Sequence, residues 1–274
     1  MSKPTIAITF ACYNQSHYTR QCVDSMIRHG QDLSRLVVVD NGSHDDTRAY
    51  LQSLPLGGLI FNQDNLGCGV AWNQGVLALQ ADWSIIMNND VLVSAGWLDN
   101  LILAAEEHGL KVISPAMIEG ELDYDFDSFA VNAGEKMKQA VRLGSGHAVC
   151  LAVHRSVWME VGYFQPVPKL MGYEDTLFFN DIEKAGIACG ISGHAWLHHY
   201  GSVTQTAMKL ERGLSEKDEL GYRYNHRLLR QSWLERKLKK LARTRQNRAW
   251  RDAEVQQYGM SMHGLRESGD FRWL

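Results

Sequence analysis

The feature that most constrains this chain is the regular alternation of strand and helix patterns over its first third. A β-rich apolar segment at 5–11 is followed by a helical pattern at 18–29, which stops at Gly30. The same order then repeats, with strands at 36–39, 59–61 and 83–87 and helices at 47–54 and 69–80. Because continuous apolar runs are typical of strands covered on both faces, these strands are expected to pair in parallel. The alternation predicts an α/β protein with a mostly parallel central sheet flanked by helices.

The rest of the chain has a mixed pattern that ends in a long helical region. Helices are expected at 97–108, 156–161 and 173–185, and strands at 112–115, 148–154, 188–191 and 195–198. From about residue 210 the sequence is helical, basic and nearly free of helix breakers until Gly259. We therefore predict a folded domain over residues 1–207 and a basic helical extension over residues 208–274.

Length and cysteine content restrict the class of protein further. With 274 residues, 45% of them hydrophobic and 22% charged, the chain is long enough to bury the core of one large α/β domain. Its five cysteines are widely scattered without a Cys-x-x-Cys pair, which excludes a disulfide scaffold and a zinc ribbon. No window approaches the roughly 18 to 20 apolar residues that span a bilayer. We expect a cytoplasmic protein, soluble or peripheral at the inner face of the membrane.

The net charge of −3 is unevenly distributed along the chain. Residues 209–251 contain 14 Lys and Arg against 5 Asp and Glu, which leaves the remainder near −12. Apolar side chains recur at helical spacing among these cations: Leu228, Leu229, Trp233, Leu234, Leu238 and Leu241. Such a stripe packs on the rest of the chain or on a second subunit, or it meets an anionic lipid surface. Nucleic acid is less favoured, because the region has few aromatic side chains to stack on bases.

Polar residues follow each of the first four predicted strands. They form the segments Ala11-Cys12-Tyr13-Asn14, Asp40-Asn41-Gly42-Ser43, Asn62-Gln63-Asp64-Asn65-Leu66-Gly67 and Asn88-Asn89-Asp90. Ligands of open parallel sheets bind at the carboxyl ends of the strands, so these segments are expected to form one site. Neither the Gly-x-Gly-x-x-Gly pattern nor the Walker pattern occurs in these turns. A nucleotide site without a glycine-rich phosphate loop usually neutralises its diphosphate with a metal.

These segments resemble the motifs of the inverting glycosyltransferases of family 2, which have the GT-A fold. Further resembling segments are Asn65-Leu66-Gly67 with Asn73-Gln74-Gly75, Gly172-Tyr173-Glu174-Asp175, and His199-Tyr200-Gly201-Ser202. The motifs stand in the family's order and spacing between about residues 5 and 202. The resemblance implies a nucleotide-sugar-binding half over residues 1–110 and an acceptor half over residues 111–207.

The resemblance also implies which residues bind the nucleotide-sugar donor. They are Ala11, Tyr13, Asp40, Asn65, Gly67, Asn73 and Asn89. Tyr13 would pack against the base, and Asp40 would accept a hydrogen bond from the base or the ribose. The structural alternatives are that Asp40 bonds its own turn and that the asparagines cap local backbone.

Asn88-Asn89-Asp90 resembles the Asp-x-Asp motif that holds a divalent cation against the diphosphate. Its first acidic position is Asn here, so Asp90 alone supplies a negatively charged ligand. One carboxylate suffices where Mg²⁺ or Mn²⁺ takes further oxygen ligands from phosphate and water. His199 resembles the late histidine that closes over the same metal, although a histidine at such a position is commonly a hydrogen-bonded core residue.

Glu174 and Asp175 are expected at the start of a helix, where carboxylates are favoured by the helix dipole. The resemblance implies that Asp175 is the general base that deprotonates the acceptor hydroxyl, with Glu174 in support. The family often has Asp at the position of Leu177 and Arg at that of Asp181, so the acceptor contacts are expected to differ here.

The implied activity is that of a hexosyl or deoxyhexosyl transferase. It would move a sugar from a nucleoside diphosphate sugar, with UDP- and dTDP-sugars favoured, to a glycan or lipid-linked acceptor in surface polysaccharide synthesis. A nucleotidyltransferase is an alternative, but its basic glycine-rich first loop is missing, since residues 11–16 contain no Lys or Arg. The single carboxylate at Asp90 leaves open a second alternative, a non-catalytic protein of the same fold that binds a sugar or a polyanion.

Overall fold

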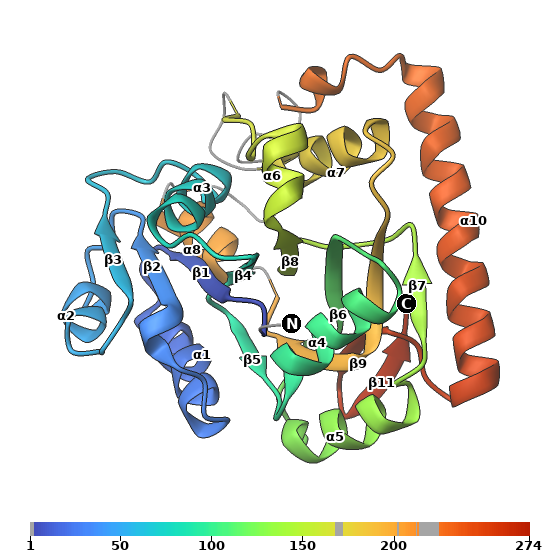
Figure 1. Cartoon of the computed structure of the whole chain (residues 1–274), viewed down its shortest axis with the longest axis horizontal. Coiled ribbons are helices and arrows are strands. Elements are labelled where there is room, and N and C mark those ends of the chain that lie inside the picture. Colours follow the sequence, from blue (N-terminus) through green and yellow to red (C-terminus); the bar gives the residue numbers. More distant parts are fainter. Residues whose placement is uncertain (1–2, 168–171, 202, 212, 214–224) are drawn as a thin grey trace.

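The computed structural model describes residues 3–167, 172–201, 203–211, 213 and 225–274 as a mixed α/β protein with a curled central sheet (Figure 1). The elements of the first half are β1 (Ile6–Cys12), α1 (Ser16–Arg28), η1 (Leu33–Arg35), β2 (Leu36–Asp40), α2 (Thr47–Gln52), β3 (Gly58–Phe61), α3 (Cys68–Ala78), β4 (Trp83–Asn88), β5 (Val91–Val93) and α4 (Trp97–Glu107). The second half contains β6 (Val112–Gly120), α5 (Phe126–Lys136), β7 (Val141–Leu143), β8 (Cys150–His154), α6 (Arg155–Val161), α7 (Glu174–Lys184), β9 (Cys189–His199), α8 (Val203–Glu211), η2 (His226–Leu229), α10 (Trp233–Tyr258), β10 (His263–Glu267) and β11 (Asp270–Trp273).

The central sheet confirms the predicted α/β class. Its strand order is β11-β10-β6-β8-β4-β1-β2-β3, with β1 parallel to both β2 and β4, and β2 parallel to β3. The strand β8 runs antiparallel to β4 and β6, so the sheet is mixed, as large sheets commonly are. The four parallel strands therefore end at one common edge.

The apolar pattern of the sequence accounts for the local packing of the first half. All five residues of β2 are buried, which agrees with its continuous apolar run. Helix α1 buries Cys22, Val23 and Met26 against the sheet. Helix α3 approaches β1 so closely that a Cβ on Gly75 would lie 1.8 Å from Thr9 Oγ1, so only glycine fits there.

The strand β9 connects the two halves of the molecule. The sequence predicted two short strands here, but the structure has one continuous strand of 11 residues. It pairs in parallel with β6 and antiparallel with β5 and β7, with a register shift between Pro115 and Ala116. This register places His199 opposite Val91 on one side and Glu119 on the other.

The carboxyl-terminal region is only partly what the sequence predicts. A long basic helix is present, but Leu228 and Leu229 lie in the short helix η2, and Arg230 has a left-handed backbone (φ 49°) that separates η2 from α10. The prediction of one continuous apolar stripe is therefore wrong for Leu228 and Leu229. Two strands that the sequence did not predict follow the helix, and β10 pairs in parallel with β6.

A buried ion pair fixes α10 to the domain. Arg142 in β7 donates from Nε to Glu254 Oε1 at 2.9 Å and from Nη2 to Oε2 at 2.6 Å. The hydroxyl of Ser261 and the amide of Met262 donate to the same carboxylate. The guanidinium also lies over the ring of Trp250, 5.5 Å from its centroid. The second half of α10 is thus held by a bidentate pair whose remaining lone pairs are satisfied.

The five cysteines all lie in the described part of the chain and are free thiols, as expected from their spacing. Among the helices of these described residues, none is sufficiently long and apolar to cross a membrane.

Candidate functional site

Backbone hydrogen bonds hold the segments after the parallel strands side by side. The backbone amide of Asn41 donates to Cys12 O at 2.8 Å, and the backbone amide of Asn62 donates to Asp40 O at 2.9 Å. The structure therefore brings together the ends of β1, β2 and β3, as the parallel pattern predicts.

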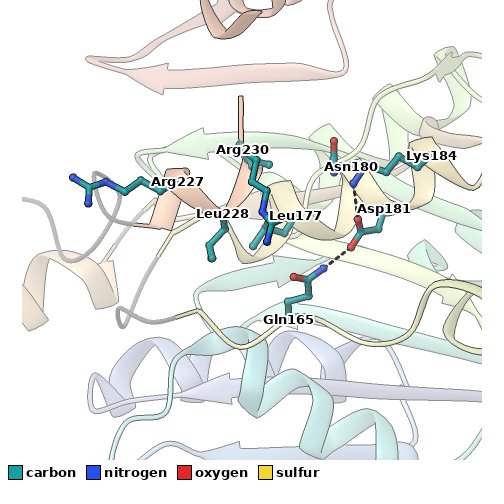
Figure 2. A pocket seen from close by; sticks show the side chains of 9 residues that line it. Gln165, Leu177, Asn180, Asp181, Lys184, Arg227, Leu228 and Arg230 are labelled. Carbon is teal, nitrogen blue, oxygen red and sulfur yellow. Dashed lines mark hydrogen bonds and ion pairs between the residues drawn. The ribbon is translucent and has the colours of Figure 1, made fainter. Parts of the chain in front are cut away.

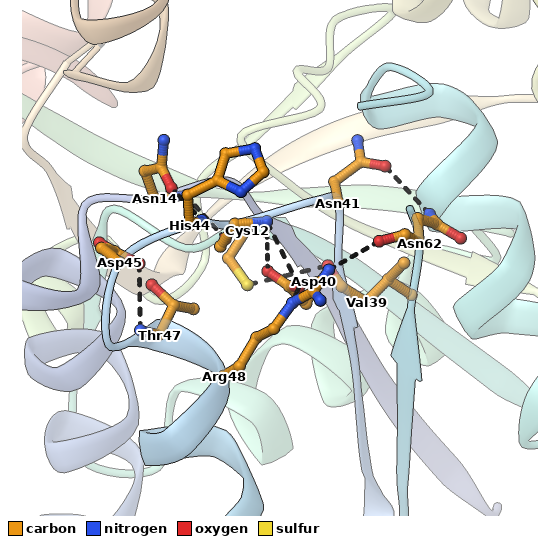
Figure 3. Close-up of polar contacts among 11 residues, drawn as sticks. Cys12, Asn14, Val39, Asp40, Asn41, His44, Asp45, Thr47, Arg48 and Asn62 are labelled. Carbon is orange, nitrogen blue, oxygen red and sulfur yellow. Dashed lines mark hydrogen bonds and ion pairs between the residues drawn. The ribbon is translucent and has the colours of Figure 1, made fainter. Parts of the chain in front are cut away.

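Asp40 is fully buried at the end of β2. Its carboxylate accepts a 2.6 Å hydrogen bond from Arg48 Nε, and Arg48 in turn donates from Nη2 to Asn62 O at 2.8 Å. The amide of Ser43 also donates to Asp40 Oδ1 at 3.2 Å, which is the turn contact that the sequence offered as the structural alternative (Figure 3). Asp40 therefore organises the loop after β2, with Arg48 as a partner that the sequence did not predict.

Asn41 is buried and is not among the predicted donor-binding residues. Its amide nitrogen donates to Asn65 Oδ1 at 2.9 Å, and its oxygen accepts from Asn62 Nδ2 at 3.0 Å and from the amide of Leu66 at 3.1 Å. Asn65 Oδ1 also accepts from the amide of Gly67 at 3.0 Å. This network connects β2 to the start of α3, where Gly67 has a positive φ of 84°.

Helix α8 lies over the end of β1. Tyr13 Oη donates to Glu211 Oε2 at 2.9 Å, and Asn14 Nδ2 donates to Glu211 Oε1 at 2.8 Å. The half-buried Ala11 lies in β1 two residues before this contact. Ser202, which precedes α8 and ends the last resembling segment, lies outside the described residues. A donor base that packs on the ring of Tyr13 would therefore lie beside α8.

The other two predicted donor-site asparagines, like Asn65, are hydrogen bonded to protein groups. Asn73 Nδ2 donates to Phe164 O at 2.8 Å, and its Oδ1 accepts from the Phe164 amide at 3.1 Å. Asn89 is buried, and its Nδ2 donates to Thr19 Oγ1 at 2.9 Å. The side-chain amide of Asn73 thus holds the segment at Phe164, and that of Asn89 holds helix α1 at Thr19.

A cluster of acidic residues and histidines lies where β5, β6 and β9 meet. The buried His199 is 3.4 Å from Asp90 Oδ1 through Nε2, and its Nδ1 donates to Glu119 Oε1 at 3.2 Å. Asn88 Nδ2 lies 3.4 Å from the same Nε2. On the far side, His263 Nε2 donates to Glu119 Oε2 at 3.2 Å. The predicted pair Asp90 and His199 is therefore in contact, and two unpredicted residues extend it.

The charges of this cluster stabilise one another. Burial disfavours the charged imidazolium of His199, but hydrogen bonds to Asp90 and Glu119 outweigh it and raise the pKa of His199 to about 9. Hydrogen bonds from His199 and His263 hold the pKa of Glu119 well below its usual range. Glu119 is thus ionised, with a histidine ring nitrogen on each carboxylate oxygen.

Glu174 and Asp175 begin α7, as predicted. Glu174 is buried, and Cys68 Sγ, at the start of α3, donates to its Oε1 at 2.6 Å. Burial raises the pKa of Glu174 and that of the Cys68 thiol. Asp175 is half-buried and accepts from the amide of Thr176 at 2.6 Å. The preceding Tyr173 has a φ of 74°, a strained conformation for a bulky residue.

A cavity of about 600 Å³ lies between α7 and η2 (Figure 2). Its lining includes Leu177, Asp181 and Lys184 from α7 together with Leu228 and Arg230. Gln165 Nε2 and Lys184 Nζ donate to the two oxygens of Asp181 at 2.7 and 3.3 Å. Leu177 and Asp181, the two positions after Asp175 at which the sequence departs from the family pattern, therefore both line this cavity.

Solved structures show where this fold occurs. A mannosyltransferase from Pyrobaculum calidifontis, in complex with GDP-mannose and Mn²⁺, superimposes with a TM-score of 0.57 at 17% identity over 77% of this chain and 61% of that chain. GalNAc-T7 with UDP, GalNAc and Mn²⁺ gives 0.55 at 13% identity over 72% and 44% of the two chains. Residues 1–349 of TarS from S. aureus give 0.55 at 16% identity over 75% and 63%. The fold is the GT-A fold of these glycosyltransferases.

A family model and sequence relatives both match this chain. An uncharacterized glycosyltransferase of Rickettsia felis is 29% identical over 89 residues, 32% of this chain and 15% of the relative. The putative glycosyltransferase EpsH of Bacillus subtilis is 22% identical over 116 residues, 41% of this chain and 34% of the relative. The chain thus matches about a third or less of the length of these relatives. The sequence model of glycosyl transferase family 2 matches residues 8–158, more than half of the chain. With these motifs on a GT-A fold, the chain belongs to glycosyl transferase family 2.

Proposed function

We propose that this protein transfers a sugar from a nucleoside diphosphate sugar to an acceptor hydroxyl in a single displacement that inverts the anomeric centre. The observation that supports this most is the contact between Cys68 and Glu174. It fixes the start of α7, and with it Asp175, against the start of α3, which the Asn41 network ties to the end of β2. A carboxylate suited to deprotonate an acceptor thus stands beside the edge at which parallel strands bind nucleotides.

The residues near Asp90 fit a divalent cation that also binds the donor diphosphate. Within the described ranges, no group of three His, Cys, Asp and Glu side chains is arranged to hold a metal by itself. Asp90 and His199 supply one carboxylate and one imidazole, and Mg²⁺ or Mn²⁺ commonly completes such a set with phosphate oxygens and water. Glu119 holds Nδ1 of His199, so Nε2, after the loss of its proton, is the nitrogen left to face the cation. When bound, the cation would neutralise the charge that develops on the leaving diphosphate.

The reaction requires a proton acceptor on the side of the acceptor. In the proposed step the hydroxyl oxygen attacks the anomeric carbon, the bond from that carbon to the diphosphate oxygen breaks, and the hydroxyl proton passes to Asp175. Glu174 is buried and its Oε1 accepts a hydrogen bond from Cys68 Sγ, so it is the weaker candidate for a group that must reach the acceptor hydroxyl. Its role in this proposal is to orient the start of α7 through Cys68.

The donor and acceptor are proposed by class. Among the structural neighbours, one is described with GDP-mannose and one with UDP and GalNAc, and both contain Mn²⁺. We infer a purine or pyrimidine nucleoside diphosphate sugar as donor, and a glycan or lipid-linked sugar as acceptor. Thermal shifts with UDP, dTDP and GDP, each with and without Mn²⁺, identify the base, because a nucleotide that binds the native state raises Tm.

The replacement Asp90→Asn tests the donor site. It keeps the size of the side chain but removes the single acidic ligand, so donor affinity in Mn²⁺ is expected to fall roughly tenfold or more. Calorimetric titration of the nucleotide identified by thermal shift measures this affinity with Mn²⁺ and with EDTA. The variant and the parent should bind equally in EDTA. Equal affinities in Mn²⁺ would contradict the proposed role of Asp90.

The replacement Glu119→Ala tests whether the hydrogen bond from Nδ1 of His199 to Glu119 orients His199 for metal binding. Loss of the carboxylate that holds Nδ1 of His199 is expected to weaken Mn²⁺ binding about tenfold, as is usual for groups that orient a metal ligand. His263→Ala, one hydrogen bond further away, is expected to have a smaller effect in the same direction. Electron paramagnetic resonance of free Mn²⁺, in the presence of the nucleotide, reads affinity independently of turnover. Unchanged affinity in Glu119→Ala would show that the histidine needs no such support.

A further inference from the structure

Helix α10 carries an apolar stripe that the rest of the described chain does not cover. Leu234, Leu238 and Leu241 are 57%, 57% and 50% exposed. At about 100° per residue these three side chains fall on one face of the helix. Trp233, at the edge of this face, is 66% exposed. We call Trp233, Leu234, Leu238 and Leu241 the α10 stripe.

The α10 stripe points away from the domain. The residues through which α10 contacts the domain include Trp250 and Glu254, which meet the buried Arg142. By the same helical geometry these two residues lie roughly opposite to Leu234, Leu238 and Leu241. Figure 1 shows α10 at the margin of the molecule, beyond β7. The sequence alternative in which these side chains pack on their own domain is therefore wrong for the part of the chain that the structure describes.

The surroundings of the α10 stripe are cationic. Residues 233–251 contain eight Lys and Arg and a single acidic residue, Glu235. Glu235 is engaged in the capping box with Ser232 at the start of the helix. Lys237, Arg245 and Arg248 are exposed beside or within the stripe, and Lys237 Nζ lies 5.0 Å above the ring of Trp233. An occupant of this face has to be apolar at its centre and anionic at its margin.

We infer that α10 lies flat on a membrane surface that contains anionic phospholipids, with the α10 stripe among the acyl chains and the cations at the headgroups. Helices with Leu and Trp on one face and Lys and Arg around it bind such interfaces. A second copy of this chain is a poorer occupant, because two such helices would bring their cations together at the contact. This inference is independent of the proposed reaction, since no residue of the candidate site lies on α10.

Co-sedimentation of the full chain with vesicles tests the inference. We expect binding to vesicles of phosphatidylcholine with one-third phosphatidylglycerol, weaker binding as salt is raised, and little binding to pure phosphatidylcholine. The variant Leu234→Ser, Leu238→Ser, Leu241→Ser should reduce the partition coefficient about tenfold or more at low salt. Lys237→Glu, Arg245→Glu, Arg248→Glu should abolish the preference for the anionic vesicles.

Matched controls separate the α10 stripe from apolar exposure in general. Met159 in α6 and Val131 in α5 are 85% and 56% exposed, so Met159→Ser, Val131→Ser should leave vesicle binding unchanged. All substituted residues are exposed, and circular dichroism checks that each variant is folded. Absence of parent binding to the anionic vesicles at low salt would overturn the inference. A dimer in sedimentation velocity that the Leu→Ser variant dissociates would overturn it in favour of a second copy.

Discussion

Asp175→Asn is expected to lower the turnover number by roughly 100-fold or more while donor affinity is retained. The amide has nearly the same shape as the carboxylate and can still accept the hydrogen bond from the amide of Thr176, so the start of α7 should keep its conformation. It cannot, however, take the proton of the acceptor hydroxyl. Single-turnover transfer assays, with calorimetric donor titrations on the same preparation, separate the chemical step from binding.

Glu174→Gln is the matched comparison for that prediction. Glu174 faces Cys68 and is buried with a raised pKa, so a neutral amide should replace it with a smaller loss of turnover. If Glu174→Gln is the more damaging of the two, the roles of base and supporting residue are exchanged. If both variants retain parental turnover, neither carboxylate is the base, and the proposed step is wrong.

Arg142→Met is expected to have the largest effect on stability, a loss of about 3–5 kcal/mol in the free energy of unfolding. The side chains of Arg142 and Glu254 are only 5% and 10% exposed. Removal of the guanidinium leaves the carboxylate of Glu254 in the interior with Ser261 and Met262 as neutral donors. Urea unfolding followed by circular dichroism measures the loss.

The double variant Arg142→Met, Glu254→Met tests the cause of this loss. It removes the stranded charge as well, so part of the stability should return relative to the single variant. Hydrogen exchange locates the damage, since α10 and β10 are the elements that the pair fixes to β7. A single variant that loses less than about 1 kcal/mol would show that the pair contributes no more than a surface salt bridge.

The local sequence determines much of the first half of the molecule. The alternation of apolar runs and helical patterns predicts β1 to β4 and the helices between them, because each element buries a face that its own residues define. Parallel pairing then brings the ends of these strands to one edge, so the strand pattern alone assigns the segments that contain Tyr13, Asp40 and Asp90 to a common region. The same local signals place Glu174 and Asp175 at the start of a helix.

Contacts between distant residues depend on strand register, which no local pattern encodes. Glu119 is 80 positions from His199 in the chain and 144 positions from His263. The three residues meet because β6 pairs with β9 on one side and with β10 on the other. Cys68 reaches Glu174 only after α3 has packed on the sheet. The sequence likewise shows that α10 is amphipathic, but the direction of its apolar face is decided by the tertiary structure. The ion pair between Arg142 and Glu254 turns the opposite face toward the domain, and this leaves the leucines in the solvent.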